Sequence, residues 1–242
     1  MNVLFIRGLT RESRHWLGLE KKFQEKNPEV SVISIDLPGA GKYFQQTSPG
    51  TIDEYVFFLR NKLSEVKAVG PTTLIGISMG GMIALRWAEL FPNDLAKVFA
   101  INTSAKNLSS RKERFNFKEF KKLLGILLTD NPMLKEERIL KLTTEQFVIT
   151  NNVLKKFAEI ATTNPVSIRS TLNQIWAASN FSIDHALDIP VVIISGLKDK
   201  LVDPECSKKL AITLGATLVS HPDAGHDLPL DDPDWLLSEL RL

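Results

Sequence analysis

The sequence predicts an α/β protein built on a doubly wound, mostly parallel sheet of about six strands. Short runs rich in Val, Ile and Leu recur along the chain, and helix-length amphipathic segments separate most of them. Such runs are typical of strands buried on both faces, and their alternation with helices predicts parallel βαβ units. The predicted strands are residues 2–6, 30–35, 72–75, 97–102, 191–195 and 216–220. The predicted helices between them are residues 16–26, 52–66, 79–91 and 204–214.

The composition is that of an ordinary globular protein. The 242 residues are 43% hydrophobic and 24% charged, which is enough for a sizeable core and argues against disorder. A net charge of +2 gives no global reason to expect a nucleic-acid partner. No apolar run approaches the roughly 20 residues that span a bilayer, and the first one is too short for a signal peptide. We therefore expect a cytoplasmic protein with neither a nucleic-acid nor a membrane partner.

A long helical insertion interrupts the alternation. Residues 104–187 carry helical patterns broken at Asn131-Pro132 and Asn164-Pro165, and they stand between two strands that should be neighbours in the sheet. Both ends of the insertion return to the same sheet. We therefore predict a helical cap at 104–187 on one core made of residues 1–103 and 188–242.

The third predicted strand leads into a serine bracketed by glycines. The pattern Gly-x-Ser-x-Gly places Ser78 between Gly76 and Gly80, immediately before the helix 79–91. A strand, a tight glycine-flanked turn and a helix form a nucleophile elbow, which exposes the serine hydroxyl above the edge of the sheet. The alternative is a tight strand-to-helix turn that carries an inert serine.

Chemistry-bearing side chains follow three of the strands. In a doubly wound sheet the site lies beyond the carboxyl ends of the strands. Ser78, Asp199 and His226 occupy such positions, and a serine needs a histidine to accept its proton and an acid to orient that histidine. Asp203 is an alternative acid, although its place before a predicted helix suits a cap. His221 is an alternative base at the end of the last strand.

The remaining titratable side chains have plainer interpretations. His15 and His185 are expected to be structural or surface residues, and Asp36 to form a turn. The sole cysteine, Cys206, cannot form an internal disulfide and is expected to pack in a helix. The four histidines and one cysteine show no paired metal-ligand spacing, and no phosphate-binding loop is present. We therefore expect neither a metal nor a cofactor.

Four motifs together give the chain a family resemblance. They are the elbow at 76–80, Asp-Leu-Pro-Gly-x-Gly at 36–41, Gly-x-x-Asp at 196–199 and Ala-Gly-His-Asp at 224–227. In order and spacing they resemble the α/β-hydrolase family over almost the whole chain. Among its members the chain looks most like the small capped carboxylesterases, which include the pimeloyl-carrier-protein methyl esterases. It departs from them at Arg7, where the family usually has histidine, and at Ile77, where those esterases have tryptophan.

The resemblance implies a serine hydrolase that cleaves a carboxylic ester or thioester through an acyl-enzyme, without a cofactor. Ser78, His226 and Asp199 would form the catalytic triad. The backbone N–H groups of Leu9 and Met79 would form the oxyanion hole, and Gly8 would let its loop approach closely. The predicted substrate contacts are Gly8, Ile77, Phe120 and Trp176. The alternatives are a carbon–carbon bond hydrolase of the same fold and a non-catalytic ligand-binding pseudoenzyme.

The cap supplies expectations about the substrate. Its apolar side chains suggest a channel for an acyl group, although packing between helices accounts for many of them. They are Phe115, Phe117, Phe120, Leu123, Leu124, Ile126, Leu127, Leu128, Phe147, Phe157, Trp176 and Phe181. Its basic side chains could dock an acidic acyl carrier protein, or could simply form a solvated face. They are Lys106, Arg111, Lys112, Arg114, Lys118, Lys121 and Lys122.

Overall fold

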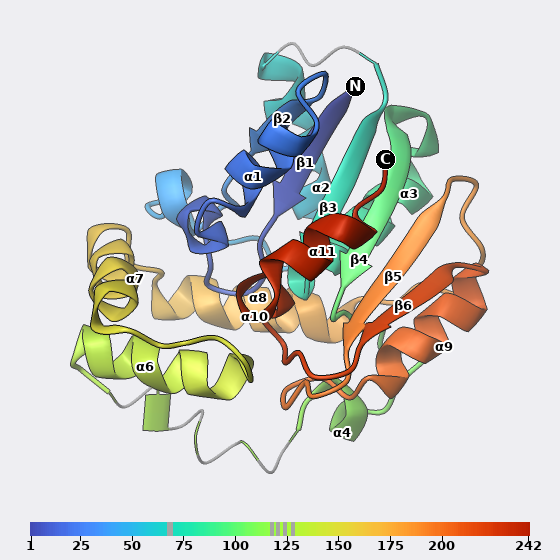
Figure 1. Ribbon diagram of the computed structural model, residues 1–242. Coiled ribbons are helices and arrows are strands. Elements are labelled where there is room, and N and C mark those ends of the chain that lie inside the picture. Colours follow the sequence, from blue (N-terminus) through green and yellow to red (C-terminus); the bar gives the residue numbers. More distant parts are fainter. Residues whose placement is uncertain (67–69, 117–118, 120–121, 123–124, 127–128) are drawn as a thin grey trace.

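The computed structural model describes residues 1–66, 70–116, 119, 122, 125–126 and 129–242 (Figure 1). Its centre is a six-stranded sheet in the order β2-β1-β3-β4-β5-β6, in which every neighbouring pair is parallel. The strands are β1 (Asn2–Ile6), β2 (Ser31–Ser34), β3 (Thr72–Ile77), β4 (Leu95–Ile101), β5 (Val191–Gly196) and β6 (Thr217–His221). The predicted doubly wound α/β fold is thus confirmed.

Helices cover both faces of the sheet. They are α1 (Leu19–Lys26), α2 (Ile52–Glu65), α3 (Met79–Leu90), α9 (Glu205–Leu214), α10 (Leu228–Asp231) and α11 (Pro233–Glu239). Side chains alternate across a strand, so Leu4 and Ile6 of β1 join one core cluster with α2, α3 and α9. Val3 and Phe5 join the opposite cluster with α1 and α11. Figure 1 shows α1 and α11 in front of the sheet and α2 and α3 behind it.

The insertion between β4 and β5 contains α4 (Arg111–Arg114), α6 (Pro132–Thr143), α7 (Asn151–Thr163) and α8 (Ile168–Asn180). Asn131 caps α6 by accepting the Leu134 N–H, and Pro132 occupies the first turn, where its missing donor costs nothing. Helix α7 ends before Asn164 and Pro165, as the sequence pattern predicts. Figure 1 shows α6, α7 and α8 beyond the carboxyl ends of the strands. The cap segment therefore lies at the edge where the candidate residues gather.

Two smaller features complete the description. A small apolar cluster joins the cap helices α6 and α7 to α10, through Leu140, Leu154, Phe157, Ile160 and Leu230. Short 3₁₀ turns at Ser13–Trp16, Gly41–Tyr43 and Pro92–Asp94 connect the main elements. Among the described residues, no helix combines the length and the apolar character needed to cross a membrane.

Candidate active site

Ser78 lies on a strained turn between β3 and α3. Its backbone has φ 55° and ψ −118°, a conformation that a residue with a side chain rarely adopts. A methyl group on Gly80 would overlap the carbonyl oxygen of Ile6 in β1, and one on Gly76 would overlap that of Gly80. Both glycines are therefore required by close backbone approach. Strain of this kind persists only where the surrounding structure enforces it, and it gathers at functional sites.

The turn leaves the Ser78 hydroxyl available. The Ser78 N–H donates to the carbonyl of Ile101 at 2.8 Å, and its own carbonyl accepts the Thr103 hydroxyl at 2.8 Å. A serine before a helix usually caps it, but Ser78 makes no side-chain cap bond to α3. No hydrogen bond joins its Oγ to another group in the described part of the chain.

Asp199 and His226 form a short hydrogen-bonded pair. Asp199 Oδ2 lies 2.6 Å from His226 Nδ1, and the two side chains are 2% and 12% exposed. The second carboxylate oxygen of Asp199 accepts the N–H groups of Leu201 and Val202, so both oxygens are held. Burial opposes protonation of His226, but the Asp199 carboxylate outweighs it, and the pKa of His226 is raised above its usual 6.5. The pair can orient the imidazole and stabilise its charged form.

Asn102 fastens the loop that carries His226, and sequence reasoning missed it. Asn102 follows β4 with φ 48°, and its Nδ2 donates to the carbonyls of Gly225 at 3.0 Å and His226 at 2.8 Å. Its Oδ1 accepts the Gly196 N–H at 2.8 Å. The next residue, Thr103, bonds to Ser78 as described above, so adjacent residues hold the serine and the histidine. The sequence offered one signal for this role, an asparagine at the end of a strand, because asparagine tolerates the positive φ of a tight turn.

The loop after β1, residues 7–10, lies against the serine. A methyl group on Gly8 would stand 3.1 Å from Ser78 Cβ and 3.7 Å from its Oγ. The N–H groups of Leu9 and Met79 donate to no hydrogen bond within the described residues. Thr10 has φ 56°, and its N–H donates to Gln174 Oε1 in α8 at 2.8 Å. We call residues 7–10 the oxyanion loop, after the role that the sequence predicts for the Leu9 amide.

The alternative acid and base have other partners. Asp203 accepts the Glu205 N–H at the start of α9, as expected of a capping aspartate. His221 Nε2 lies 3.2 Å from Asp232, and its Nδ1 accepts the Ala224 N–H at 2.9 Å. Asp36 accepts the N–H groups of Ser13 and Lys42, so it stabilises the turns on either side of it. The structure brings Asp199, and not Asp203, to His226.

The predicted substrate contacts remain predictions. Ile77 is 3% exposed and belongs to the core cluster that faces α1 and α11. Trp176 is 66% exposed on α8, on the side that also carries Ile168 and Leu172. Phe120 lies outside the described residues. So do the cap residues Phe117, Lys118, Lys121, Leu123, Leu124, Leu127 and Leu128.

At least three of the basic cap residues contact the protein itself, and one of them is Lys122, which pairs with Glu119 at 2.7 Å. Arg114 is half-buried and donates to the carbonyls of Ala178 and Ser179, and burial lowers its pKa. Lys106 donates to the side chain of Asn180 at 3.0 Å. The contacts of Arg114 and Lys106 tie the start of the cap to the end of α8. Docking of an acidic acyl carrier protein here stays a prediction.

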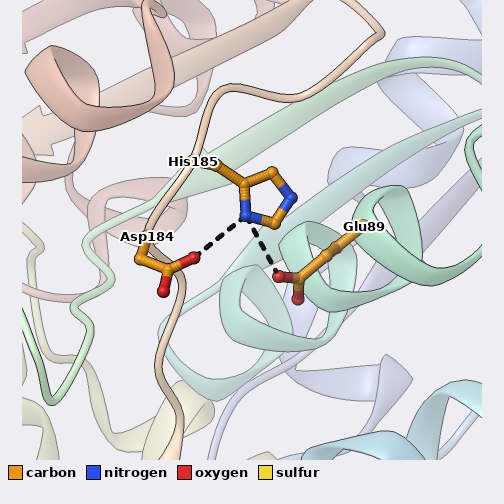
Figure 2. A group of neighbouring side chains, drawn as sticks. All are labelled: Glu89, Asp184 and His185. Atoms are coloured by element: carbon orange, nitrogen blue, oxygen red, sulfur yellow. Dashed lines mark hydrogen bonds and ion pairs between the residues drawn. The ribbon is translucent and has the colours of Figure 1, made fainter.

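A second cluster of titratable groups lies away from this site. Figure 2 shows His185 between Asp184 and Glu89, with Nδ1 3.0 Å and 3.7 Å from the two carboxylates. The hydrogen bond to Asp184 raises the pKa of His185, although part of the imidazole is exposed to solvent. Arg86 also pairs with Glu89. A proton on His185 and the Arg86 charge therefore satisfy these carboxylates as a surface ion cluster.

Known proteins of the same architecture match the chain throughout. The family model for the alpha/beta hydrolase fold matches residues 2–233. Monoacylglycerol lipase ABHD6 of Bos taurus is 22% identical over 244 residues, covering 96% of this chain and 72% of the lipase.

Solved structures give the same result for the fold. An esterase from Exiguobacterium antarcticum superposes with a TM-score of 0.80 at 17% identity, covering 99% of this chain and 90% of the esterase. A thermophilic esterase from Thermogutta terrifontis superposes at 0.73 with 21% identity, covering 100% of this chain and 88% of that one. The expected family resemblance is thus confirmed, and the chain belongs to the alpha/beta hydrolase fold family.

Proposed function

We propose that this protein is a serine hydrolase that cleaves a carboxylic ester or thioester through an acyl-enzyme. The observation that carries the proposal is the 2.6 Å pair of Asp199 and His226 at the sheet edge that presents the strained Ser78. A serine nucleophile needs a base to accept its proton and a third group to orient that base, and His226 and Asp199 would supply them. The two unused amides of Leu9 and Met79 supply the donors for an oxyanion.

The roles follow from the chemistry of the groups. His226 takes the proton from Ser78 Oγ as the oxygen attacks the carbonyl carbon of the substrate, and Asp199 stabilises the imidazolium. The electron pair of the carbonyl moves to its oxygen, where the amides of Leu9 and Met79 donate to it. When the intermediate collapses, the C–O or C–S bond breaks and His226 gives its proton to the leaving alcohol or thiol. Water then attacks the acyl carbon while His226 accepts its proton. The bond from that carbon to Ser78 Oγ breaks, His226 returns the proton to Oγ, and the carboxylic acid leaves.

The named relatives support an ester as the substrate. They include a monoacylglycerol lipase and two esterases, and each of those names describes the cleavage of an ester. A small or medium acyl ester fits this class and needs no cofactor. A thioester is a second candidate substrate, because the same attack at the carbonyl carbon would release a thiol in place of an alcohol.

Covalent labelling tests the nucleophile. A fluorophosphonate should add one label to the protein, and peptide mass spectrometry should place that label on Ser78. Ser78→Ala should abolish both labelling and hydrolysis of p-nitrophenyl esters, whereas Ser64→Ala, an exposed serine on α2, should change neither. A labelled Ser78→Ala variant that retains full activity would refute the proposal.

A substrate panel tests the leaving group. p-Nitrophenyl esters of increasing chain length, acyl thioesters and the methyl ester of an acyl carrier protein should be compared by kcat/KM. We expect turnover of the simple esters. A preference for the carrier-bound methyl ester that salt weakens would support the acidic partner predicted from the basic cap residues.

A further inference from the structure

A buried ion pair connects the oxyanion loop to the histidine loop, which we define as residues 224–227. Arg7 stands immediately before Gly8, and Asp227 immediately after His226. Arg7 Nη1 donates to Asp227 Oδ1 at 3.0 Å, and Nη2 donates to Oδ2 at 2.7 Å. Both residues are 5% exposed. A two-point bond between planar groups fixes their relative orientation as well as their separation.

Stability alone does not explain this pair. Removing two charges from water is costly, and apolar side chains of similar volume often stabilise a protein as well or better. The cost is higher here because Arg7 Nε is buried without a hydrogen-bond partner within the described residues. The guanidinium lies over the Trp16 ring at 4.7 Å, which recovers part of that cost. A role in placing the two loops accounts for the geometry better.

Each end of the pair is attached to a fixed element. Arg7 continues directly from β1, in which Ile6 pairs with Gly76 of β3. The Asp227 N–H donates to the carbonyl of Thr143, at the end of α6, at 2.7 Å. A displacement of either loop beyond small changes in hydrogen-bond length would therefore break a bidentate bond.

The charges of the pair also act on His226. The charged groups that act on its pKa are Asp199 after β5, which bonds to its Nδ1, Asp227 in its own loop and Arg7 after β1. Asp199 and Asp227 raise its pKa, whereas burial and Arg7 lower it. The nearby carboxylate of Asp231 is taken up by backbone N–H groups, including that of Gly225. Arg7 and Asp227 therefore act on the pKa of His226 in opposite directions, and Asp199 is the largest of the charges that raise it.

We propose that Arg7 and Asp227 are positioning residues, which hold the oxyanion and histidine loops in place and cancel each other's charge at His226. The inference rests on the proposed function, since it assigns the Leu9 amide and His226 their catalytic roles. The inference predicts that removing one charge of the pair moves the pKa of His226 and that removing both leaves it in place. A pair that only stabilised the fold would move the pKa in neither case.

The test is a cycle of Arg7→Gln, Asp227→Asn and the double variant. Asp227→Asn leaves Arg7 uncompensated, so the acid limb of the kcat/KM profile should move to lower pH by about half a unit or more. The double variant removes both charges, so the limb should return to its original pH while kcat stays about tenfold or more below that of the unaltered protein. Arg7→Lys keeps the charge and loses the two-point bond. It should lower kcat without moving the limb.

A second readout needs no turnover. The four histidines can be titrated by ¹H NMR, with His226 assigned by its loss in His226→Gln. The pKa of His226 should fall in Asp227→Asn and recover in the double variant. Arg60→Gln is the matched control, because Arg60 makes two bonds to Asp94 at the surface, and it should move neither readout.

The outcomes separate the two proposals. Variants with a lower melting temperature but an unmoved pKa and acid limb would show a purely structural pair and overturn the inference. If the unaltered protein hydrolyses no ester, the proposed function fails instead, while the NMR cycle still reports whether the two charges cancel at His226.

Discussion

The elbow at residues 76–80 and the histidine loop at residues 224–227 lie at the same edge of the sheet and are held by different contacts. The elbow is fixed sterically, since Gly80 allows its backbone to pass close to β1 and Gly76 allows β3 to pass close to the start of α3. The histidine loop is fixed by polar bonds from distant segments, which come from Asn102, Arg7 and Thr143. The turn that presents the proposed nucleophile is thus encoded locally, and the placement of the proposed base depends on tertiary structure.

The way in which each region is held fits the function proposed for it. A steric turn admits one conformation and tolerates almost no substitution, which suits the proposed role of Ser78, whose hydroxyl must always project. A polar network adjusts by small changes in hydrogen-bond length, which suits the proposed role of His226, which would gain and lose a proton in each cycle. Substitutions in the two regions should therefore fail in different ways.

The largest expected effect is at Asp199, the acid that we propose orients His226. Asp199→Asn should lower kcat by about 10⁴, because the amide favours the wrong imidazole tautomer while leaving the packing intact. Steady-state kinetics with a p-nitrophenyl ester measures this. Asp203→Asn is the control, and it should cost about 1 kcal/mol of stability or less through the helix start. The reverse ranking of the two variants would assign the acid to Asp203.

Next in size is the steric test of the elbow. Gly80→Ala puts a methyl group onto the Ile6 carbonyl, so the strand and the helix must separate. We expect a loss of about 3 kcal/mol, or roughly 6–12 °C in Tm, with loss of activity. Gly50→Ala is the matched control, because a methyl group at Gly50 meets nothing within 4 Å. Equal melting temperatures for the two variants would mean that the elbow is not sterically fixed.

These contrasts explain how far the sequence could predict the site. Ser78 was predictable because strand, glycines and helix are contiguous, so the turn is written in neighbouring residues. Asp199 and His226 were predictable because parallel strands bring their carboxyl ends to one edge. Asn102 was not, because its partner His226 is 124 positions away. Arg7 is 220 positions from Asp227, and which polar side chains meet over such distances is decided by packing.

Asn102 tests the polar side of the comparison. Asn102→Ala removes three hydrogen bonds, leaves the Gly196 N–H buried without its partner and keeps a positive φ that alanine disfavours. We expect a cost of about 2–3 kcal/mol and a lower kcat. Unlike Gly80→Ala, the variant should retain measurable turnover, because the loop can shift and still present His226. Thermal unfolding and kinetics together measure this. Complete inactivity in a folded Asn102→Ala variant would contradict the view that the loop adjusts.

The smallest expected effect is the dependence of folding stability on pH, which has opposite signs for His15 and His226. Burial and the nearby Arg11 lower the pKa of His15 well below 6.5, so the unfolded chain binds its proton more readily. His15 therefore costs stability as pH falls below the unfolded value, by at most about 2 kcal/mol between pH 7 and pH 5. His226 has a raised pKa, so its contribution is fully present below the unfolded value and is lost as pH rises through the folded one. Thermal unfolding from pH 5 to pH 8 should show that His15→Gln flattens the loss of stability in acid, whereas His226→Gln steepens it. If the stability curves of the two variants run parallel, the pKa of His226 is not raised in the folded protein, which would contradict the effect expected of its contact with Asp199.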